Sequence, residues 1–278
     1  MKVKLASNYG FCFGVKRAIK IAEDYENSAT MGPLIHNQDE INRLKNDFNV
    51  GLYNNLSDVK DHDTVIIRTH GIPKNDLKHL RTLNAKIINA TCPFVTTPQQ
   101  IVKKMSSEGY SILIFGDSDH PEVKGVQSYA ENQDDVHIVL EPSDLQNIIF
   151  KNNKIATVAQ TTKKKEKYLE IVNYLILKNK EVRVFNTICD ATFENQDAAR
   201  ELSKEVDIMI VIGGKNSSNT KQLHSICLEN CPNSYLIENE TELENSWFLN
   251  KNLCGVTAGA STPDWIIQQV VDKIESFN

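Results

Sequence analysis

Three of the six cysteines occupy similar settings in this sequence, which are "GFCFG" at Cys12, "ATCP" at Cys92 and "TICDAT" at Cys189. Each follows an apolar, strand-like segment and comes before a segment with helical periodicity. The unpaired N–H groups and the dipole at a helix N-terminus favour the thiolate form of a nearby cysteine. We therefore predict that these three thiols are functional, as ligands of a metal or as nucleophiles.

The other three cysteines lie in apolar patterns. Cys227 falls on the helical face of Leu223 and Ile226, Cys231 precedes a proline at the end of a predicted helix, and Cys254 lies within a predicted strand. A free cysteine often packs as a small apolar side chain. We expect all three to belong to the core.

Three thiolates can hold zinc together with a fourth ligand, or they can hold an iron–sulfur cluster. Structural zinc sites usually contain local Cys-x-x-Cys pairs, and this sequence has none. A cluster with one ligand from each of three distant segments fits the spacing better. If the cluster is a cubane, three ligands leave one iron open, and an open iron is a Lewis acid.

Polar side chains gather in further loops after predicted strands. A helix N-terminus with hydroxyl and amide groups attracts anions. The segment "GGKNSS" does not form a P-loop, because Met209 and Asn216 replace the required glycine and Ser or Thr. The polar loops therefore predict an anionic substrate, but they do not indicate a nucleotide. The residues concerned are His36 in "GPLIHN", His70 in "THG", His120 in "DHPE", and Ser217, Ser218 and Asn219 in "KNSSN".

The elements that must position these residues alternate between strand and helix, which predicts an α/β fold. Functional sites in such folds form at the carboxyl ends of the strands. Thr97 before Pro98, and Thr262 before Pro263, are predicted to begin helices. The predicted strands are "KVKLA", "TVIIR", "KIINA", "SILIFG", "KIATVA", "VRVFN", "DIMIVIGG" and "LCGVTA".

The wide spacing of the three cysteines predicts three related α/β lobes, with one cysteine from each at a common centre. We place the lobes at residues 1–92 (the Cys12 loop), 93–188 (the "HPE" loop) and 189–278 (the "KNSSN" and "GAST" loops).

The composition limits the partners. The net charge is −5, and no basic stripe offers a surface for nucleic acid. The dense run "KKKEK" at 163–167 is expected to be a solvated face. Apolar runs such as "IMIVI" have the length of strands, so no membrane partner is predicted. We expect a cytoplasmic protein with reduced cysteines.

Taken together, the motifs resemble the 4-hydroxy-3-methylbut-2-enyl diphosphate reductase family, also called IspH or LytB. The resemblance implies a cloverleaf of three α/β lobes around a central 4Fe–4S cluster. It also implies reduction of (E)-4-hydroxy-3-methylbut-2-enyl diphosphate to isopentenyl and dimethylallyl diphosphate, the last step of the non-mevalonate pathway. The electron donor would be reduced ferredoxin or flavodoxin. The motifs are "GFCFGVKRAI", "THG", "ATCP", "HPEV", "QTT", "NTICDAT", "KNSSN" and "GVTAGASTPD".

The resemblance also implies roles for individual residues. Cys12, Cys92 and Cys189 match the cluster ligands, which leave one iron open. Glu122 and Thr161 match the pair near the substrate hydroxyl, where Glu122 would relay protons. The positions that match the diphosphate site are His36, His70, His120, Ser217, Ser218, Asn219 and Ser261.

Two other functions fit parts of the pattern. A cysteine-dependent acyl transferase would use Cys12 or Cys92 with a histidine, but it would leave two of the thiols without a role. A non-redox protein that binds a diphosphate or sugar phosphate would use the polar loops and bury the thiols in its core. Iron and sulfide content separates both from a reductase.

Overall fold

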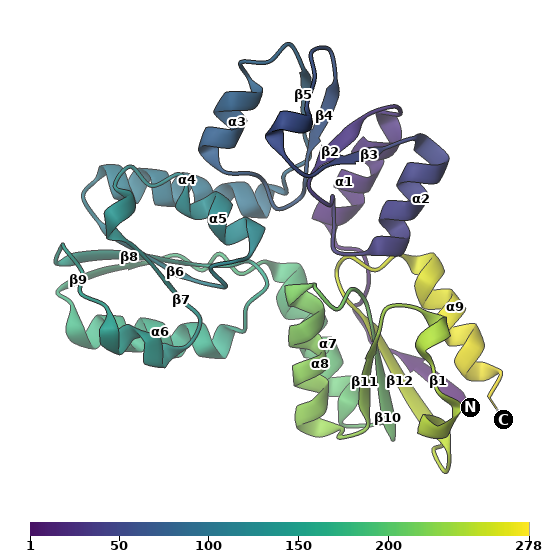
Figure 1. Cartoon of the computed structure of the whole chain (residues 1–278). Helices are drawn as coiled ribbons and strands as arrows, with labels where there is room; N and C mark the ends of the chain where they lie inside the picture. Colours follow the sequence, from purple (N-terminus) through teal and green to yellow (C-terminus); the bar gives the residue numbers. More distant parts are fainter. Residues whose placement is uncertain (278) are drawn as a thin grey trace. The chain divides into compact units, whose positions relative to one another are not determined.

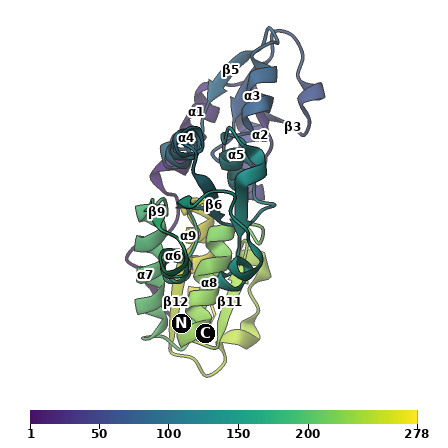
Figure 2. The ribbon, with the colours of Figure 1, turned by 90° about the vertical axis from the view of Figure 1, so that its left-hand side faces the viewer.

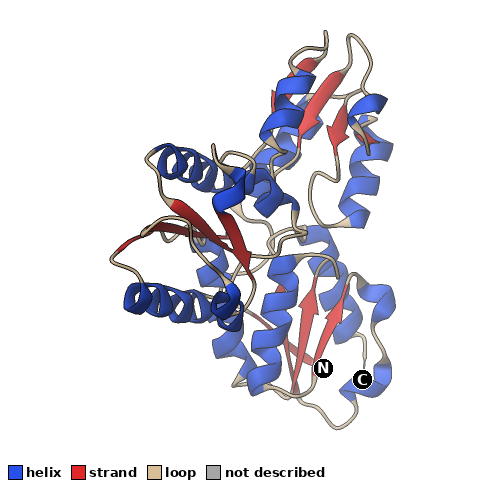
Figure 3. Ribbon diagram, turned by 60° about the vertical axis from the view of Figure 1, so that its left-hand side comes forward, coloured by secondary structure: helices blue, strands red, loops and turns tan. Residues whose placement is uncertain are grey.

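The computed structural model describes residues 1–277, in which strands and helices alternate (Figure 3). The strands form three sheets of four strands, and all neighbouring strands are parallel. The α/β prediction is therefore confirmed. The strands are β1 (Lys2–Leu5), β2 (Ala29–Met31), β3 (Gly51–Tyr53), β4 (Thr64–Ile67), β5 (Lys86–Asn89), β6 (Ser111–Phe115), β7 (Val136–Val139), β8 (Lys154–Ala159), β9 (Glu181–Val184), β10 (Ile208–Ile212), β11 (Ser234–Ile237) and β12 (Leu253–Ala258).

Helices connect the strands, as parallel pairing requires. The α-helices are α1 (Phe13–Asp24), α2 (Gln38–Phe48), α3 (Lys74–Leu80), α4 (Pro93–Ser107), α5 (Pro121–Gln127), α6 (Lys165–Lys178), α7 (Asp190–Ser203), α8 (Ser218–Asn230) and α9 (Asp264–Glu275). The short 3₁₀ helices within residues 1–277 are η1 (Leu56–Asp58), η2 (Gln133–Asp135), η3 (Pro142–Asn147), η4 (Glu240–Glu242) and η5 (Asn245–Phe248).

The three sheets share one strand order. Their orders are β3-β2-β4-β5, β7-β6-β8-β9 and β1-β12-β10-β11. In the first two sheets, the chain begins at the second position, continues to the edge at the first position, and then crosses over to the third and fourth positions. The third sheet has the same order when β1, from the start of the chain, takes the place of a fourth strand. Below, the strands of each sheet are numbered in this order of the chain. The first strands are β2, β6 and β10, the second are β3, β7 and β11, the third are β4, β8 and β12, and the fourth are β5, β9 and β1.

The chain divides into two compact units. Unit 1 contains residues 1–16, 35–43 and 190–278, and unit 2 contains residues 17–34 and 44–189. The sheet of β1 lies in unit 1, and the other two sheets lie in unit 2. The three lobe boundaries given by the sequence stay a prediction.

Unit 1 has helices on both faces of its sheet, with α7 and α8 on one face and α9 on the other (Figure 1). The central strand β10 is buried on both faces, which explains its uninterrupted apolar sequence. Ile208, Ile210 and Ile212 pack in the cluster that contains the α9 side chains. Met209 and Val211 pack in the cluster with α7 and α8. Successive side chains of a strand point to opposite faces, so this alternation builds both cores.

Unit 2 contains the two remaining sheets. The sheet of β6 has α4 and α5 on one face and α6 on the other (Figures 1 and 2). Val102 of α4 and Val123 of α5 share a cluster with Ile112 and Ile114 of β6. In the sheet of β2, Leu80 of α3 packs in a cluster with side chains of β2 and β4.

Two predicted helix starts need different treatment. The prediction that Thr97 begins a helix is wrong, because α4 already begins at Pro93 and contains Pro98. Thr97 instead donates its hydroxyl to the carbonyl of Pro93 at 3.2 Å, within the helix. The second start is close, because α9 begins at Asp264, directly after Pro263.

The expectation of a solvated "KKKEK" run is wrong for Lys163, which is 6% exposed. This lysine lies in a turn before α6, where its N–H donates to the carbonyl of Gln160 at 3.2 Å. Burial lowers the pKa of Lys163, and the charges of Asp117 and Glu141 oppose that change. A turn rather than a helix face therefore positions this side chain.

Candidate active site

Each first strand is followed directly by a glycine whose N–H donates to the last carbonyl of the second strand. The same hydrogen bond therefore joins these two strands in all three sheets, although the glycines differ in φ. Gly213 has a φ of +147°, and a side chain there would approach Thr262 Oγ1 to 2.7 Å, so only glycine fits. The three bonds are Gly32 to Tyr53 at 2.9 Å, Gly116 to Val139 at 2.9 Å, and Gly213 to Ile237 at 2.8 Å.

The fourth residue after each of these glycines is a predicted diphosphate ligand: His36, His120 or Ser217. His120 is the N-cap of α5, where its Nδ1 accepts the N–H of Glu122 at 3.2 Å. Ser217 is the N-cap of α8. The equivalent loop presents His36 just before α2. All three side chains therefore lie where helix N–H groups favour an anion.

The three predicted cluster ligands occupy equivalent positions in the three sheets. Each follows the fourth strand and directly precedes a helix, which is α1, α4 or α7. Each also donates its backbone N–H to the carbonyl of the residue two positions after the third strand. These bonds are Cys92 to Thr69 at 3.0 Å, Cys189 to Thr161 at 3.1 Å, and Cys12 to Ala260 at 3.2 Å.

Burial separates these cysteines from the other three. Cys12, Cys92 and Cys189 are partly exposed, whereas Cys227, Cys231 and Cys254 are buried. Burial raises the pKa of both Cys227 and Cys254 to about 12, so their thiols stay protonated at neutral pH. The prediction that the second group lies in the core is confirmed, and its members are poor sources of a thiolate.

Glu122 and Thr161 form a buried pair in unit 2. Glu122 is 1% exposed, and its carboxylate accepts the Thr161 N–H at 2.7 Å and the Thr161 hydroxyl at 2.8 Å. Burial raises the pKa of Glu122 to about 6, although both hydrogen bonds and the charge of Lys163 act in the opposite direction. A carboxyl group with this pKa exchanges its proton near neutral pH, which suits an acid–base role.

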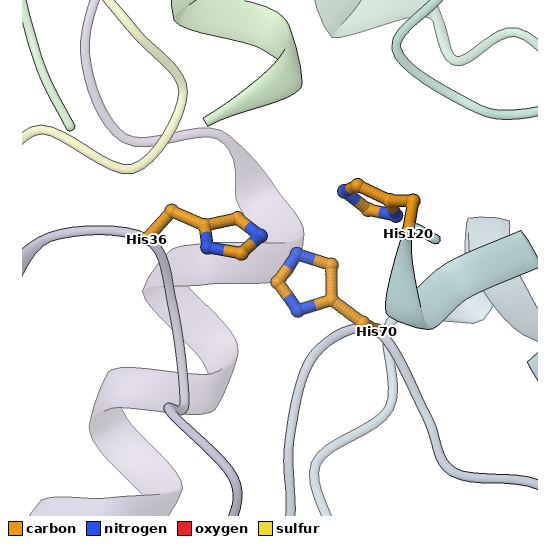
Figure 4. Close-up of side chains that lie close together, drawn as sticks. All are labelled: His36, His70 and His120. Carbon is orange, nitrogen blue, oxygen red and sulfur yellow. The ribbon is translucent and has the colours of Figure 1, made fainter. Parts of the chain in front are cut away.

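His70 and His120 lie side by side in unit 2 (Figure 4). Their ring centroids are 5.3 Å apart at an interplanar angle of 81°, and one nitrogen of each ring lies within 4.8 Å of the other. Thr69 donates its hydroxyl to the Leu34 carbonyl at 2.8 Å, which holds the loop that carries His70. The edge contact places two imidazole rings side by side, and an imidazole N–H is a hydrogen-bond donor that suits an anion.

Unit 1 carries its own group of predicted ligands. Asn219 is 3% exposed, and neither its Oδ1 nor its Nδ2 has a hydrogen-bond partner among residues 1–277. Buried amides are nearly always paired, so this side chain is a candidate for contact with a ligand. Ser261 donates its hydroxyl to the His36 carbonyl at 3.3 Å. A side chain at Gly214 would approach that same carbonyl to 2.3 Å, which makes glycine necessary there.

The predicted residues therefore divide between the units. Each unit brings its own group to the loops at the carboxyl ends of parallel strands, as the sequence indicated. Unit 2 holds His70, Cys92, His120, Glu122, Thr161 and Cys189, and unit 1 holds Cys12, His36, Ser217, Ser218, Asn219 and Ser261.

Sequence reasoning missed the residues that hold these loops in place. The clearest signal for them is a glycine followed four positions later by His or Ser, in "GPLIH", "GDSDH" and "GGKNS". The pattern becomes visible only when the first strands are aligned. Sequence reasoning also missed the carbonyls of Thr69, Thr161 and Ala260. They accept the N–H groups of the three cysteines, which depends on backbone geometry alone.

Comparisons of sequence and of structure relate this chain to known proteins. A model of the LytB protein family matches residues 3–275. None of the helices within residues 1–277 has the length and apolar character needed to cross a membrane.

Curated relatives match along their whole length. A protein of Sulfurovum sp. is 64% identical over 277 residues, covering 100% of both chains. A protein of Nitratiruptor sp. is 62% identical and covers 100% of this chain and 99% of its own. Both are named 4-hydroxy-3-methylbut-2-enyl diphosphate reductase.

Solved structures agree with the sequence matches. One is described as (E)-4-hydroxy-3-methyl-but-2-enyl diphosphate reductase, the terminal enzyme of the non-mevalonate pathway. It is 43% identical, with a TM-score of 0.72 and 99% coverage of both chains. Another, the E-1-hydroxy-2-methyl-but-2-enyl-4-diphosphate reductase of Plasmodium falciparum, has a TM-score of 0.91 at 28% identity. It covers 98% of this chain and 87% of its own.

Proposed function

Because this chain belongs to the LytB family, we propose that it is a 4-hydroxy-3-methylbut-2-enyl diphosphate reductase. The reaction breaks the allylic C–O bond of the substrate and replaces the hydroxyl group with hydrogen. It consumes two electrons and two protons and releases water together with isopentenyl or dimethylallyl diphosphate. This reaction is the last step of the non-mevalonate isoprenoid pathway.

The equivalence of the three cysteines carries the proposal. Family membership implies an iron–sulfur cofactor, and we assign Cys12, Cys92 and Cys189 as its ligands. They are the partly exposed thiols, each lies directly before a helix, and each has its N–H bonded to a carbonyl after the third strand. The donor set suits a 4Fe–4S cluster with three thiolate ligands and one open iron. When bound, the cluster supplies the electrons of the reaction.

We assign the diphosphate to the polar loops. Helix N-termini and uncharged donors bind anions without an arginine fork. The buried amide of Asn219, which has no partner in the described part of the chain, supports this assignment most directly. The proposed ligands are His36, His70, His120, Ser217, Ser218, Asn219 and Ser261.

Glu122 is the proposed proton donor. Hydroxide is a poor leaving group, and water leaves far more easily once the oxygen has gained a proton. Burial raises the pKa of Glu122 to about 6, so part of the population holds the required proton near neutral pH. Thr161 holds both carboxylate oxygens through its N–H and its hydroxyl. His120 caps the helix that carries Glu122 and so places the carboxyl group.

The electron donor is proposed to be reduced ferredoxin or flavodoxin, and the compartment to be the cytoplasm. The family resemblance supports the donor. A reducing compartment keeps cysteine ligands available for iron, which supports the location.

Anaerobic measurement of iron and sulfide tests the proposal, together with turnover of the hydroxylated diphosphate under a chemical reductant. We expect Cys92→Ser to lose bound iron and activity. Cys231→Ser is the matched control, because this buried thiol only makes long contacts of 3.9 and 3.8 Å to two carbonyls. Full iron content in Cys92→Ser would contradict the ligand assignment. A wild-type protein without iron that still binds the diphosphate would favour the non-redox alternative.

A further inference from the structure

Glu40 is a buried carboxylate in unit 1 that takes no part in the proposed reaction. It is 1% exposed. Arg43 donates from Nη2 to Glu40 Oε1 at 2.7 Å, and from Nε to both carboxylate oxygens at 3.1 Å. The indole Nε1–H of Trp265 donates to Glu40 Oε2 at 3.0 Å. A buried charge is costly unless its oxygens are paired in this way. We call Glu40, Arg43 and Trp265 the Glu40 clamp.

The clamp joins two elements that carry predicted diphosphate ligands. Glu40 lies in the first turn of α2, just after His36. Trp265 lies in the first turn of α9, just after Ser261. A second bond acts alongside the clamp, because Asn239 Nδ2 donates to Asp39 Oδ2 at 3.1 Å. The first turn of α2 is therefore attached to unit 1 by its side chains.

These attachments explain an unusual feature of the chain. The segment 35–43 follows β2, whose sheet is in unit 2, but the segment itself belongs to unit 1. The carbonyl of His36 accepts the Ser261 hydroxyl at 3.3 Å and leaves no room for a side chain at Gly214. The segment thus carries His36 to the loops after β10 and β12.

Asn37 connects the Glu40 clamp to His36 through hydrogen bonds to the first turn of α2. Asn37 Oδ1 accepts the Glu40 N–H at 2.9 Å, and the Asn37 carbonyl accepts the Ile41 N–H at 3.1 Å. A shift of Glu40 would therefore move the residue next to His36.

We propose that Glu40 and Trp265 are positioning residues that hold His36 against the Ser261 and Gly214 loops before substrate binds. The inference rests on the proposed function, in which His36 binds the diphosphate. A ligand site that is already assembled binds more tightly, because binding no longer has to order it. The diphosphate is remote from the leaving hydroxyl group. Loss of the clamp should therefore weaken binding in the ground state and the transition state alike, raising KM and leaving kcat almost unchanged.

The test compares two tryptophans of unit 1 in the iron-containing enzyme under anaerobic conditions. Trp265→Phe keeps an aromatic ring but removes the indole donor to Glu40. Trp247→Phe is the matched control, because Trp247 stacks on Tyr235 with centroids 4.0 Å apart and lies outside the clamp. Calorimetry with inorganic pyrophosphate gives the binding constant, and turnover of the hydroxylated diphosphate gives KM and kcat.

We expect Trp265→Phe to raise the pyrophosphate Kd and the KM about tenfold, the usual effect of losing a hydrogen bond to a charged group, with kcat within about twofold. Trp247→Phe should change none of them, and iron content should stay constant in both. Glu40→Ala should produce a similar loss. Trp265→Phe should add little in that background, because the two changes remove the same contact. If Glu40→Ala does not fold, Glu40→Gln provides the background.

An unchanged Kd in Trp265→Phe would overturn the proposal, and so would a lower melting temperature with unchanged KM, which indicates a merely structural role. Asn219→Ala separates this failure from failure of the proposed function. If Asn219→Ala weakens pyrophosphate binding and Trp265→Phe does not, only the clamp is refuted. If neither variant changes binding, the diphosphate assignment itself is wrong.

Discussion

Replacement of Glu122 by glutamine should make the protein more stable and much less active. The amide keeps the shape of the carboxyl group, and its oxygen can still accept the Thr161 N–H that now lies at 2.7 Å from Oε1. The Thr161 hydroxyl can turn and accept from the new NH₂ group. Glutamine has no proton to donate to the leaving oxygen, so kcat should fall by about 10²–10⁴.

The gain in stability follows from the burial of Glu122. Burial raises its pKa from 4.5 to about 6, which means that the folded state binds the proton more tightly than the unfolded state does. At about 1.4 kcal/mol per tenfold change in affinity, ionisation of the buried group costs the fold about 2 kcal/mol at pH 7. The cost is absent below pH 4.5 and appears as the pH rises through about 6. Glutamine avoids it, so the melting temperature at pH 7 should rise by roughly 4–8 °C.

Two measurements check this reasoning. Thermal unfolding at pH 7 and at pH 4.5 should show a gain in stability for Glu122→Gln that is present at neutral pH and absent at acid pH. Single-turnover reduction with excess electron donor should show a wild-type rate that falls as the pH rises above about 6. Near-normal turnover of the variant would refute Glu122 as the proton donor, and an equal or lower melting temperature at pH 7 would refute the stated cost of its burial.

Other predictions concern the neighbours of Glu122 and the diphosphate loops. Thr161→Ala should reduce kcat by only about tenfold, because water can replace the lost hydroxyl. The pH above which its rate falls should move higher, since the lost Thr161 hydrogen bond lowers the pKa of Glu122 in the wild type. Asn219→Ala should weaken pyrophosphate binding by about 1.5–3 kcal/mol in calorimetry. Its melting temperature should change little, because the amide has no hydrogen-bond partner among the residues that the structure describes. Gly214→Ala should raise the pyrophosphate Kd, because the new methyl group would lie 2.3 Å from the His36 carbonyl and must displace it.

The sequence was most informative where local patterns were strong. Val15, Ala18, Ile19 and Ala22 follow the i, i+3, i+4, i+7 spacing of one helical face, and all four are buried in α1. The apolar run around Met209 predicted β10, because a strand covered on both faces needs no polar alternation. Short strands gave no such signal. β2 and β3 have three residues each and depend on their neighbours for pairing.

Tertiary contacts decided the remaining features. The pair of Thr97 and Pro98 has residue types typical of a helix start, but α4 begins five residues earlier, at Pro93 directly after Cys92. Lys163 belongs to a basic run and is buried by the turn after β8. The Glu40 clamp joins residues separated by 225 positions, and no local pattern connects Glu40 with Trp265. Each of these outcomes depends on which segments meet in space.

Equivalent positions of the three sheets can be compared, and some of them carry the same residue type while others differ. The residue before the helix that follows each fourth strand is cysteine in all three sheets. The fourth residue after the first-strand glycine varies between histidine and serine. The proposed function explains this difference. A cluster needs the same thiolate from every sheet, whereas the substrate has a diphosphate at one end and a leaving hydroxyl group at the other. Equivalent segments must therefore supply different chemistry. Glu122 in the first turn of α5 and Asn219 in the first turn of α8 lie at the same distance from the glycine after β6 and after β10.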